Sequence, residues 1–401
     1  MKKLKRLFAA GLLLLMMVSL AACASSQISQ STGGQKESSS KSGEGTVNIG
    51  FSGPLSGPAA LYGERTLNGI KMAAEEINNN GGFEINGKTY KLNIVPLDDK
   101  YLPNETASNA KRLLQEYKTP IIFTPHSGGV MALQVFNETE KFLIGAYTSE
   151  PDVTDAGNSL TIGIPTRYDG YVEPFTDYAM KRFGKKLAAL PPSTQYGKDW
   201  AKTLLPQWEK KGGKVVYHSS IDFSKETDFF TIVTNALKEK PDVLFIGGAS
   251  EPTAKVAKQA RELGFKGGFI IMDQAKLDFM EKITGSYDVL EGSVGVLPLV
   301  KSNDPGAPAF VENYRAKFKD EPSSESGLNY IATYIFVEAM KAAKTVDDAE
   351  AIREHMQDGL DNLPKDKRVY EIPSIGDDGR LEVKRRVAVV EDGQIVLKVV
   401  D

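Results

Sequence analysis

The stretch TVNIGFSGPLSGPAALYGERTLNGIKMAAEEINNNGG, residues 46–82, indicates the fold. It begins with a short apolar run at residues 47–51, which has the character of a buried strand, and a loop rich in glycine and proline follows. Apolar residues then recur at helical spacing, at Leu67, Ile70, Ala74 and Ile77. The stretch therefore predicts a buried strand that leads into an amphipathic helix, with a stop signal at Gly81 and Gly82.

The same alternation continues along the chain. Further strand-like runs occur at residues 90–97, 121–123, 142–146, 187–190, 215–217, 243–246 and 269–272, and helical segments separate them. Short apolar strands that alternate with amphipathic helices are typical of parallel sheets covered on both faces. We therefore predict an α/β fold with two doubly wound, Rossmann-like lobes. A helix at residues 327–344 and a β-ribbon that turns at Asp392 and Gly393 would complete it.

The N-terminus has the pattern of a bacterial export signal. Basic residues precede an apolar core at residues 7–20, which is shorter than the roughly 20 residues that a membrane-spanning helix needs. The sequence LAAC at residues 20–23 resembles a lipobox, in which the cysteine is lipidated. We predict a lipoprotein signal peptide at residues 1–22 and a lipid anchor on Cys23, the chain's only cysteine; a stray cysteine in an ordinary signal peptide is the alternative.

The composition separates a tether from a folded body. Residues 23–45 are rich in Ser, Gly, Gln and Lys, and they predict a lipid-anchored flexible linker. Removing 22 residues from 401 leaves 379, a length that favours two domains. The formal charge of −3 gives no support for nucleic-acid binding or for a basic membrane-binding face.

Five loops at predicted strand ends carry candidate ligand-binding side chains, because ligands of parallel α/β sheets bind outside the carboxyl ends of the strands. These side chains are Tyr62, Ser127, Ser149, Tyr196 and Asp273.

Two of these loops suggest opposite charges in the ligand. Ser127 and the glycines after it begin a helix, where free N–H groups favour an anion, and Ser149 adds a second hydroxyl. Asp273 suits an ammonium group. On composition alone, Ser127 and Asp273 are better explained as helix caps, and Ser149 could lie in a polar turn. If Ser127 and Ser149 bind an anion and Asp273 binds an ammonium group, a zwitterion would bridge the two lobes.

A series of short motifs, in this order and spacing, resembles the leucine/isoleucine/valine-binding proteins, which are type I periplasmic substrate-binding proteins of branched-chain amino acid ABC transporters. The motifs are Val47-Asn48-Ile49-Gly50, Ser52-Gly53-Pro54, Ser56-Gly57, Tyr62-Gly63, Asn68-Gly69, Ile77-Asn78, Gly81-Gly82, Tyr196-Gly197, Asp228-Phe229 and Gly247-Gly248. The resemblance covers essentially the whole body, and Cys23 suggests the lipoprotein form of this family.

The resemblance implies roles for individual residues. Ser127, Tyr147 and Ser149 fall on carboxylate-binding positions, with Tyr147 acting through its backbone. Tyr62 and Tyr196 fall on wall tyrosines, and Asp273 replaces a glutamate that binds the ammonium group.

Two positions depart from the leucine-binding pattern. Ala249 stands where these proteins have an aromatic residue, and Asn329 is near a hydrophobic wall position. We therefore expect a ligand that is larger or more polar than leucine, or a related amide or aromatic acid.

The resemblance also implies a hinge of three segments, near residues 164–167, 296–299 and 370–382. The N-terminal lobe would comprise residues 46–165 and 297–370. The C-terminal lobe would comprise residues 166–296 and 371–401. Binding would select the closed form, which a membrane permease recognises.

Two other classes of function remain to be weighed. The chain has no G-x-S-x-G elbow and no phosphate-binding loop, and its three histidines have no zinc-type partners at useful spacing. His126 beside Ser127 is the only suspicious pair, and Asp98-Asp99 fits a solvated loop better than a catalytic acid pair. A ligand-sensing module for an amide, urea-like or aromatic-acid ligand is the alternative.

We predict a monomeric, extracytoplasmic binding protein for an ABC importer, with no enzymatic activity, cofactor or metal, that contacts the membrane only through its anchor.

Overall fold

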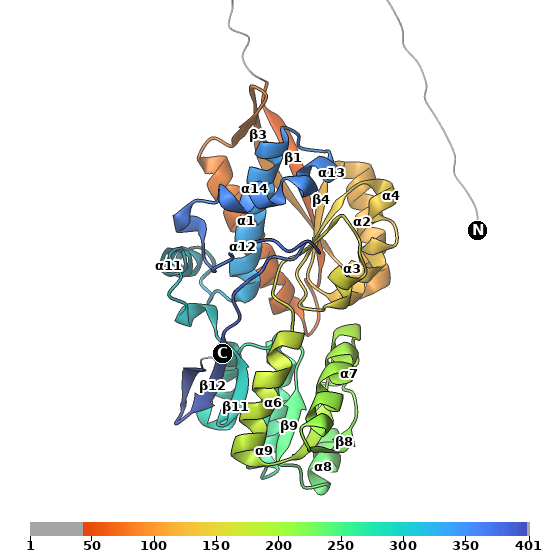
Figure 1. Cartoon of the computed structure of the whole chain (residues 1–401), viewed down its shortest axis with the longest axis vertical. Helices are drawn as coiled ribbons and strands as arrows, with labels where there is room; N and C mark the ends of the chain where they lie inside the picture. The colour runs from red at the N-terminus through yellow and green to blue at the C-terminus, as the bar shows by residue number, and fades with distance from the viewer. Residues whose placement is uncertain (1–42, 399–401) are drawn as a thin grey trace, which may run out of the picture. The chain divides into compact units, whose positions relative to one another are not determined.

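Two sheets, each covered by helices on both faces, form the two lobes of the computed structural model, which describes residues 43–398 (Figure 1). The predicted α/β class with two doubly wound lobes is confirmed. The described residues belong to one compact unit. The predicted signal peptide, Cys23 and almost the whole predicted linker lie outside the described residues.

The first lobe is built on a sheet of six strands in the order β2-β3-β1-β4-β5-β6. All neighbouring strands are parallel except β2, which pairs antiparallel with β3. The strands are β1 (Gly45–Gly53), β2 (Phe83–Ile85), β3 (Lys88–Asp98), β4 (Ile121–Thr124), β5 (Leu143–Ala146) and β6 (Thr161–Gly163). The short strands β2 and β6 were not predicted.

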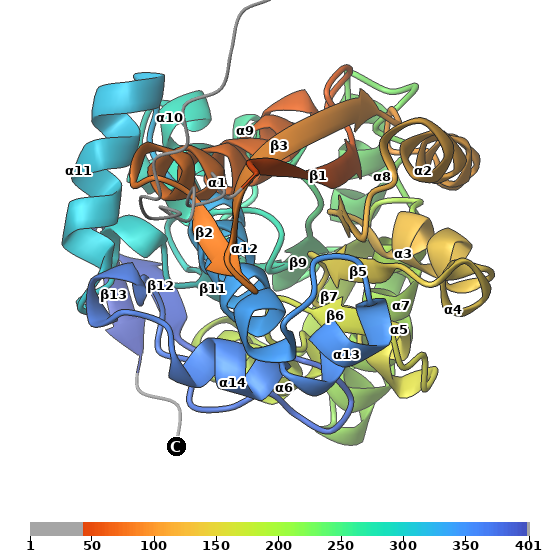
Figure 2. The ribbon, with the colours of Figure 1, turned by 90° about the horizontal axis from the view of Figure 1, so that it is seen from above.

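Helices cover both faces of this first sheet. One face packs against α1 (Ala60–Asn79) and α12 (Ser324–Ala343), which lie side by side in Figures 1 and 2. The other face packs against α2 (Pro103–Tyr117) and α3 (Ser127–Gln134). The remaining helices of this lobe are α4 (Asn137–Glu140), α5 (Asp152–Asp155), α11 (Ala307–Phe318), α13 (Ala349–Glu354) and α14 (Met356–Asp361), with single 3-10 turns at Leu299–Lys301 and Lys365–Lys367.

The second lobe repeats the plan with seven strands in the order β13-β12-β11-β10-β9-β7-β8. The strands are β7 (Lys186–Leu190), β8 (Lys214–His218), β9 (Val243–Ile246), β10 (Gly268–Ile271), β11 (Ser293–Val296), β12 (Val387–Glu391) and β13 (Gln394–Lys398). β12 and β13 form the predicted ribbon, which turns at Asp392 and Gly393, both with positive φ. β11 was not predicted.

Five helices cover the second sheet. α6 (Asp169–Phe183) and α7 (Gln195–Lys210) pack on one face. The other face carries α8 (Phe230–Lys238), α9 (Ser250–Glu262) and α10 (Leu277–Thr284), with a 3-10 turn at Tyr287–Leu290. Among residues 43–398, no helix is both long enough and apolar enough to cross a membrane.

The chain passes between the lobes three times: after β6, after β11 and just before β12. The last passage lies later than expected. Ile372, Leu381 and Val383 are buried in the core of the first lobe, and the Leu381 N–H donates to the Gly163 carbonyl at 2.8 Å. Ending the first lobe at residue 370 was therefore wrong, because burial of these apolar side chains extends it to about Val383.

Candidate ligand-binding site

The candidate site lies between the lobes, where each sheet reverses its strand order. These switch points fall between β1 and β4 and between β7 and β9. A cavity at this place is lined by all the predicted ligand-binding residues, which are Tyr62, Ser127, Tyr147, Ser149, Tyr196 and Asp273. The loops that follow the strands thus bring together residues far apart in the sequence.

Ser127 does not cap α3. His126 is the capping residue, since its Nδ1 accepts from the Gly129 N–H at 3.0 Å. The Ser127 hydroxyl lines the cavity and forms no hydrogen bond with the described residues. The free N–H groups of the first turn of α3 lie beside it.

His126 has a structural role. Its Nε2 lies 3.1 Å from Oδ2 of Asp99, which also accepts from the Thr106 hydroxyl at 2.9 Å. Asp99 is fully buried, so the expectation of a solvated loop was wrong for this residue. Because both ring nitrogens of His126 are engaged in holding the loop, the pair with Ser127 is not a nucleophile and its base.

The loop that carries Ser149 is held by a residue that sequence reasoning missed. Arg380 is buried, and its guanidinium donates to the carbonyls of Thr148 at 3.0 Å, Pro165 at 2.8 Å and Glu150 at 2.7 Å. The Tyr147 N–H donates to the Thr124 carbonyl at 3.0 Å and is therefore already engaged. This narrows the expected anion site to Ser127, Ser149 and the start of α3.

Asp273 faces the cavity from the second lobe. Its Oδ1 accepts from the Trp200 indole N–H at 3.0 Å and from the Tyr196 hydroxyl. α10 begins at Leu277, after Lys276, so Asp273 is not its cap. Its Oδ2 forms no hydrogen bond with the described residues, which leaves a carboxylate oxygen directed at the site.

Aromatic side chains enclose the cavity. Tyr62 and Tyr147 lie with ring centroids 6.2 Å apart, and Tyr101 stacks on His126 at 4.6 Å. Burial raises the pKa of Tyr62, Tyr101, Tyr147 and Tyr196 above the ordinary value for a phenol. These side chains therefore carry neutral hydroxyl groups.

A buried ion pair crosses the cleft beside Asp273. The ammonium of Lys276, from the second lobe, lies 3.3 Å from a carboxylate oxygen of Glu325 in the first turn of α12. Both side chains are almost completely buried. Lys276 also donates to the carbonyls of Asp273 and Gln274. No local signal could have found this pair, because its members are far apart in the sequence.

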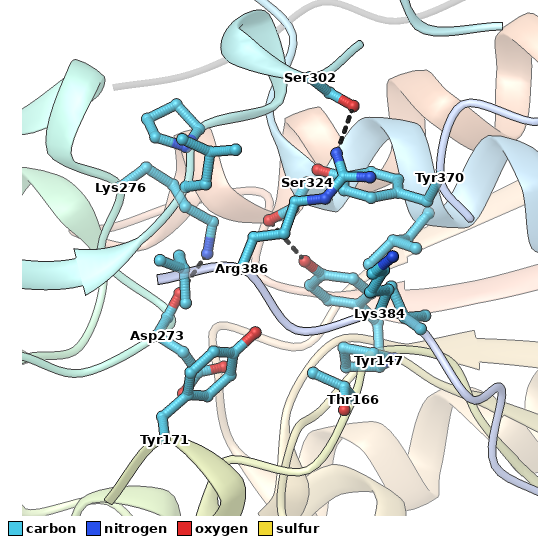
Figure 3. A pocket seen from close by; sticks show the side chains of 16 residues that line it. Tyr147, Thr166, Tyr171, Asp273, Lys276, Ser302, Ser324, Tyr370, Lys384 and Arg386 are labelled. Carbon is cyan, nitrogen blue, oxygen red and sulfur yellow. Dashed lines mark hydrogen bonds between the residues drawn. The ribbon is translucent and has the colours of Figure 1, made fainter. Parts of the chain in front are cut away.

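The site continues toward the crossovers as a second cavity of about 60 Å³. Figure 3 shows Lys276 and Asp273 on one side of it and Tyr147 and Tyr370 on the other. The Tyr147 hydroxyl donates to Ser324 Oγ at 3.2 Å, whereas the buried Tyr370 hydroxyl has no partner among the described residues. This extension is lined by both polar and apolar side chains.

Ala249 and Asn329, the two positions that depart from the leucine-binding pattern, have different surroundings in the structure. Ala249 lines a cavity of about 560 Å³ at the mouth of the cleft, so its small side chain leaves the site open there. Asn329 is fully buried and donates to the Glu325 carbonyl at 2.7 Å, while its neighbour Leu328 lines the cavity near the crossovers. Asn329 therefore supports α12 and forms no wall.

A two-lobed α/β fold with a cleft of this kind defines a protein that encloses a small molecule. Residues 46–394 match the family model described as periplasmic binding protein, and the chain belongs to that family. The members to which it is similar are substrate-binding proteins, and the chain is accordingly a binding protein and not an enzyme.

Several relatives and solved structures show the same likeness. An amino acid binding protein of Pseudomonas aeruginosa is 28% identical over 76% of this chain and 81% of its own length. A leucine-, isoleucine-, valine-, threonine- and alanine-binding protein of the same organism is 25% identical over 77% of this chain and 82% of its own. The crystal structure of a leucine binding protein from Thermotoga maritima shares the fold, with a TM-score of 0.74 at 23% identity over 88% of this chain and 98% of that one.

Proposed function

We propose that this protein is the extracytoplasmic substrate-binding lipoprotein of an ABC importer and captures an amino acid between its lobes. The proposal rests on one observation. Groups suited to a carboxylate and a group suited to an ammonium line the same cavity. Ser127 and Ser149 of the first lobe face Asp273 of the second lobe. The similarity to amino acid binding proteins supports the same ligand class.

In this proposal the α-carboxylate binds the hydroxyls of Ser127 and Ser149 and the N–H groups at the start of α3. The α-ammonium binds the free oxygen of Asp273. Charge-assisted hydrogen bonds contribute about 1.5–3 kcal/mol each. Three or four of them, with aromatic walls, are sufficient for micromolar affinity, which requires about 8 kcal/mol.

The shape of the site favours a ligand that is larger or more polar than leucine. Ala249 leaves the mouth of the cleft open, and the Tyr370 hydroxyl offers a free donor near the crossovers. A branched-chain side chain would leave that buried donor without a partner, which is costly. We therefore propose an amino acid whose side chain carries a hydrogen-bond acceptor.

The remaining parts of the proposal concern the cell. Lipidation of Cys23 would hold the monomeric protein at the outer face of a membrane. The closed, ligand-bound form would then dock on the permease subunits of the transporter. Mass spectrometry of the membrane-extracted protein tests the anchor. A diacylglyceryl-modified Cys23 is the expected N-terminus, whereas an intact Met1 or an unmodified Cys23 would contradict it.

Calorimetry with the purified full chain tests the ligand. A thermal-shift screen of amino acids, their amides and aromatic acids first identifies ligands, since a ligand that binds only the folded state raises the melting temperature. Asp273→Ala should then weaken binding of an amine-bearing ligand at least tenfold. Glu262→Ala, which removes an exposed carboxylate from the same lobe, should leave the affinity unchanged. Equal affinities for wild type and Asp273→Ala would remove Asp273 from the site.

The second candidate is a ligand-sensing module for an amide, urea-like or aromatic-acid ligand. The free hydroxyl of Tyr370, which lines the cavity near the crossovers, is the observation that favours it. In this case the screen would detect only ligands that lack an α-amine, and Asp273→Ala would not weaken their binding.

A further inference from the structure

Three carboxylates from the two lobes meet beside the first crossover, next to the loop that carries Ser149. Glu150 and Asp152 follow β5 of the first lobe, and Asp199 lies on α7 of the second. One oxygen of each lies within 4.8 Å of the other two. Three negative charges at this spacing repel one another unless something compensates them.

Glu150 is the buried member of this group. Its side chain is only 1% exposed, and its Oε1 accepts from the Tyr168 hydroxyl at 3.2 Å. Its Oε2 is buried and has no hydrogen-bond partner among the described residues. A buried carboxylate oxygen without a partner carries a large desolvation penalty.

The neighbouring cations do not compensate the negative charges of the three carboxylates. The guanidinium of Arg380 is turned to backbone carbonyls, and that of Arg167 is bound to Asp155 and Asp169. Neither forms a hydrogen bond with the three carboxylates. Asp199 accepts only from the neutral amide of Gln195, at 2.9 and 3.0 Å.

We propose that Glu150, Asp152 and Asp199 bind a divalent cation, Ca²⁺, that ties the two lobes together. Carboxylate oxygens are the preferred ligands of this hard ion. Oxygens that share one Ca²⁺ at about 2.4 Å can lie at most about 4.8 Å apart, and one oxygen of each of the three carboxylates is within that limit of the other two. Asp152 is exposed, so the ion can reach the site from solvent, and water can complete its coordination.

The placement couples the ion to the conformation of the protein. Because Asp199 belongs to the other lobe, the complete ligand set exists only when the lobes are together. Bound Ca²⁺ therefore favours the closed form over any form in which the lobes are apart. This coupling does not depend on which ligand occupies the main site.

Terbium luminescence tests the site directly, because Tb³⁺ resembles Ca²⁺ and is sensitised by nearby aromatic rings. The Tyr168 hydroxyl donates a hydrogen bond to Glu150, and its ring stacks on that of Trp200 with centroids 4.6 Å apart. Excitation of Trp200 should therefore produce Tb³⁺ emission. The purified full chain, stripped with a chelator, should bind one equivalent of Tb³⁺ that Ca²⁺ displaces. Glu150→Gln and Asp199→Asn should each weaken binding at least tenfold. Asp155→Asn, a carboxylate change outside the cluster, should alter it less than twofold.

Three results would overturn the proposal. Emission that Ca²⁺ does not displace would show that Tb³⁺ binds elsewhere. Equal Tb³⁺ affinity in the wild type and in Asp199→Asn would show that this cluster is not the binding site. If Glu150→Gln does not fold, Asp199→Asn alone decides this point. No binding of either ion, with Glu150→Gln raising the melting temperature in chelator, would show that Glu150 holds a proton in place of a metal.

Discussion

Asp278 lies in the first turn of α10, and its buried Oδ1 has no hydrogen-bond partner among the described residues. Burial is the main cause that raises its pKa from 3.8 to about 6. Glu325 acts in the same direction, and Lys276 and Lys282 oppose it. The native state therefore holds this proton more tightly than the unfolded state does.

The sign of the resulting pH dependence follows from linkage. Between about pH 4 and pH 6 the native state binds more protons at Asp278, so the contribution of this residue to stability falls as the pH rises through that window and is constant above it. Asp278→Asn should therefore melt at a higher temperature than the wild type at pH 7, and the difference should disappear near pH 4. Asp288→Asn, an exposed change nearby, should show no such window in thermal unfolding. A constant difference at both pH values would contradict the assignment.

At this scale the sequence predicted the polar loops but not their long-range partners. Ser127 and Asp273 could be chosen because side chains at the ends of parallel strands converge, whatever the length of chain between them. The pairing of Lys276 with Glu325 depends on how the two lobes meet, and the hydrogen bonds from Arg380 to the Ser149 loop join segments of the first lobe that are far apart in the sequence. No periodic pattern carries that information.

At the scale of elements, the contact between α1 and α12 fixes the first lobe. Gly69 of α1 lies so close to α12 that a Cβ atom there would stand 2.1 Å from the Ser326 carbonyl oxygen. That oxygen belongs to the backbone and cannot move without the helix. We expect Gly69→Ala to push the helices apart and to destabilise the protein by at least about 2 kcal/mol.

Urea unfolding of the purified protein checks this contact. Glu64→Ala, at an exposed position of the same helix, controls for the change in helix propensity. Because alanine is the better helix former, a stability equal to or above the wild type in Gly69→Ala would show that α1 and α12 do not approach as closely as described.

The elements that sequence patterns missed are those whose burial comes from distant contacts. β6 (TIG) and β11 (SVGV) contain glycine and a hydroxyl residue and lack the unbroken run of large apolar side chains that marks β9 (VLFI), which is no longer than β11. The segment at residues 372–383 has no regular period, and it joins the first lobe because Leu381 pairs with the end of β6 and is fully buried. The longer strands and helices were predicted because each carries its own apolar face.

At the scale of the whole molecule, the lobes are held together by direct contacts across the cleft. The Tyr101 hydroxyl accepts from the Gln274 amide at 3.2 Å, and the Arg65 guanidinium lies 3.6 Å from the centroid of the Phe279 ring. The pair of Lys276 and Glu325 is the most deeply buried of these contacts. The structure therefore describes a closed arrangement.

Removing Glu325 should favour the open arrangement. If the lobes separate, water can solvate Lys276, whereas in the closed form Glu325→Ala leaves its ammonium buried without a carboxylate, at a cost of several kcal/mol. Ligand binding must then offset this penalty, so affinity should fall at least tenfold. Small-angle scattering of the ligand-free variant should show a larger radius of gyration than the wild type. Glu338→Ala, which removes the partly buried carboxylate that pairs with Lys341 on the same helix, should change neither quantity. A Glu325→Ala variant with wild-type affinity and radius of gyration would show that the ion pair does not control closure.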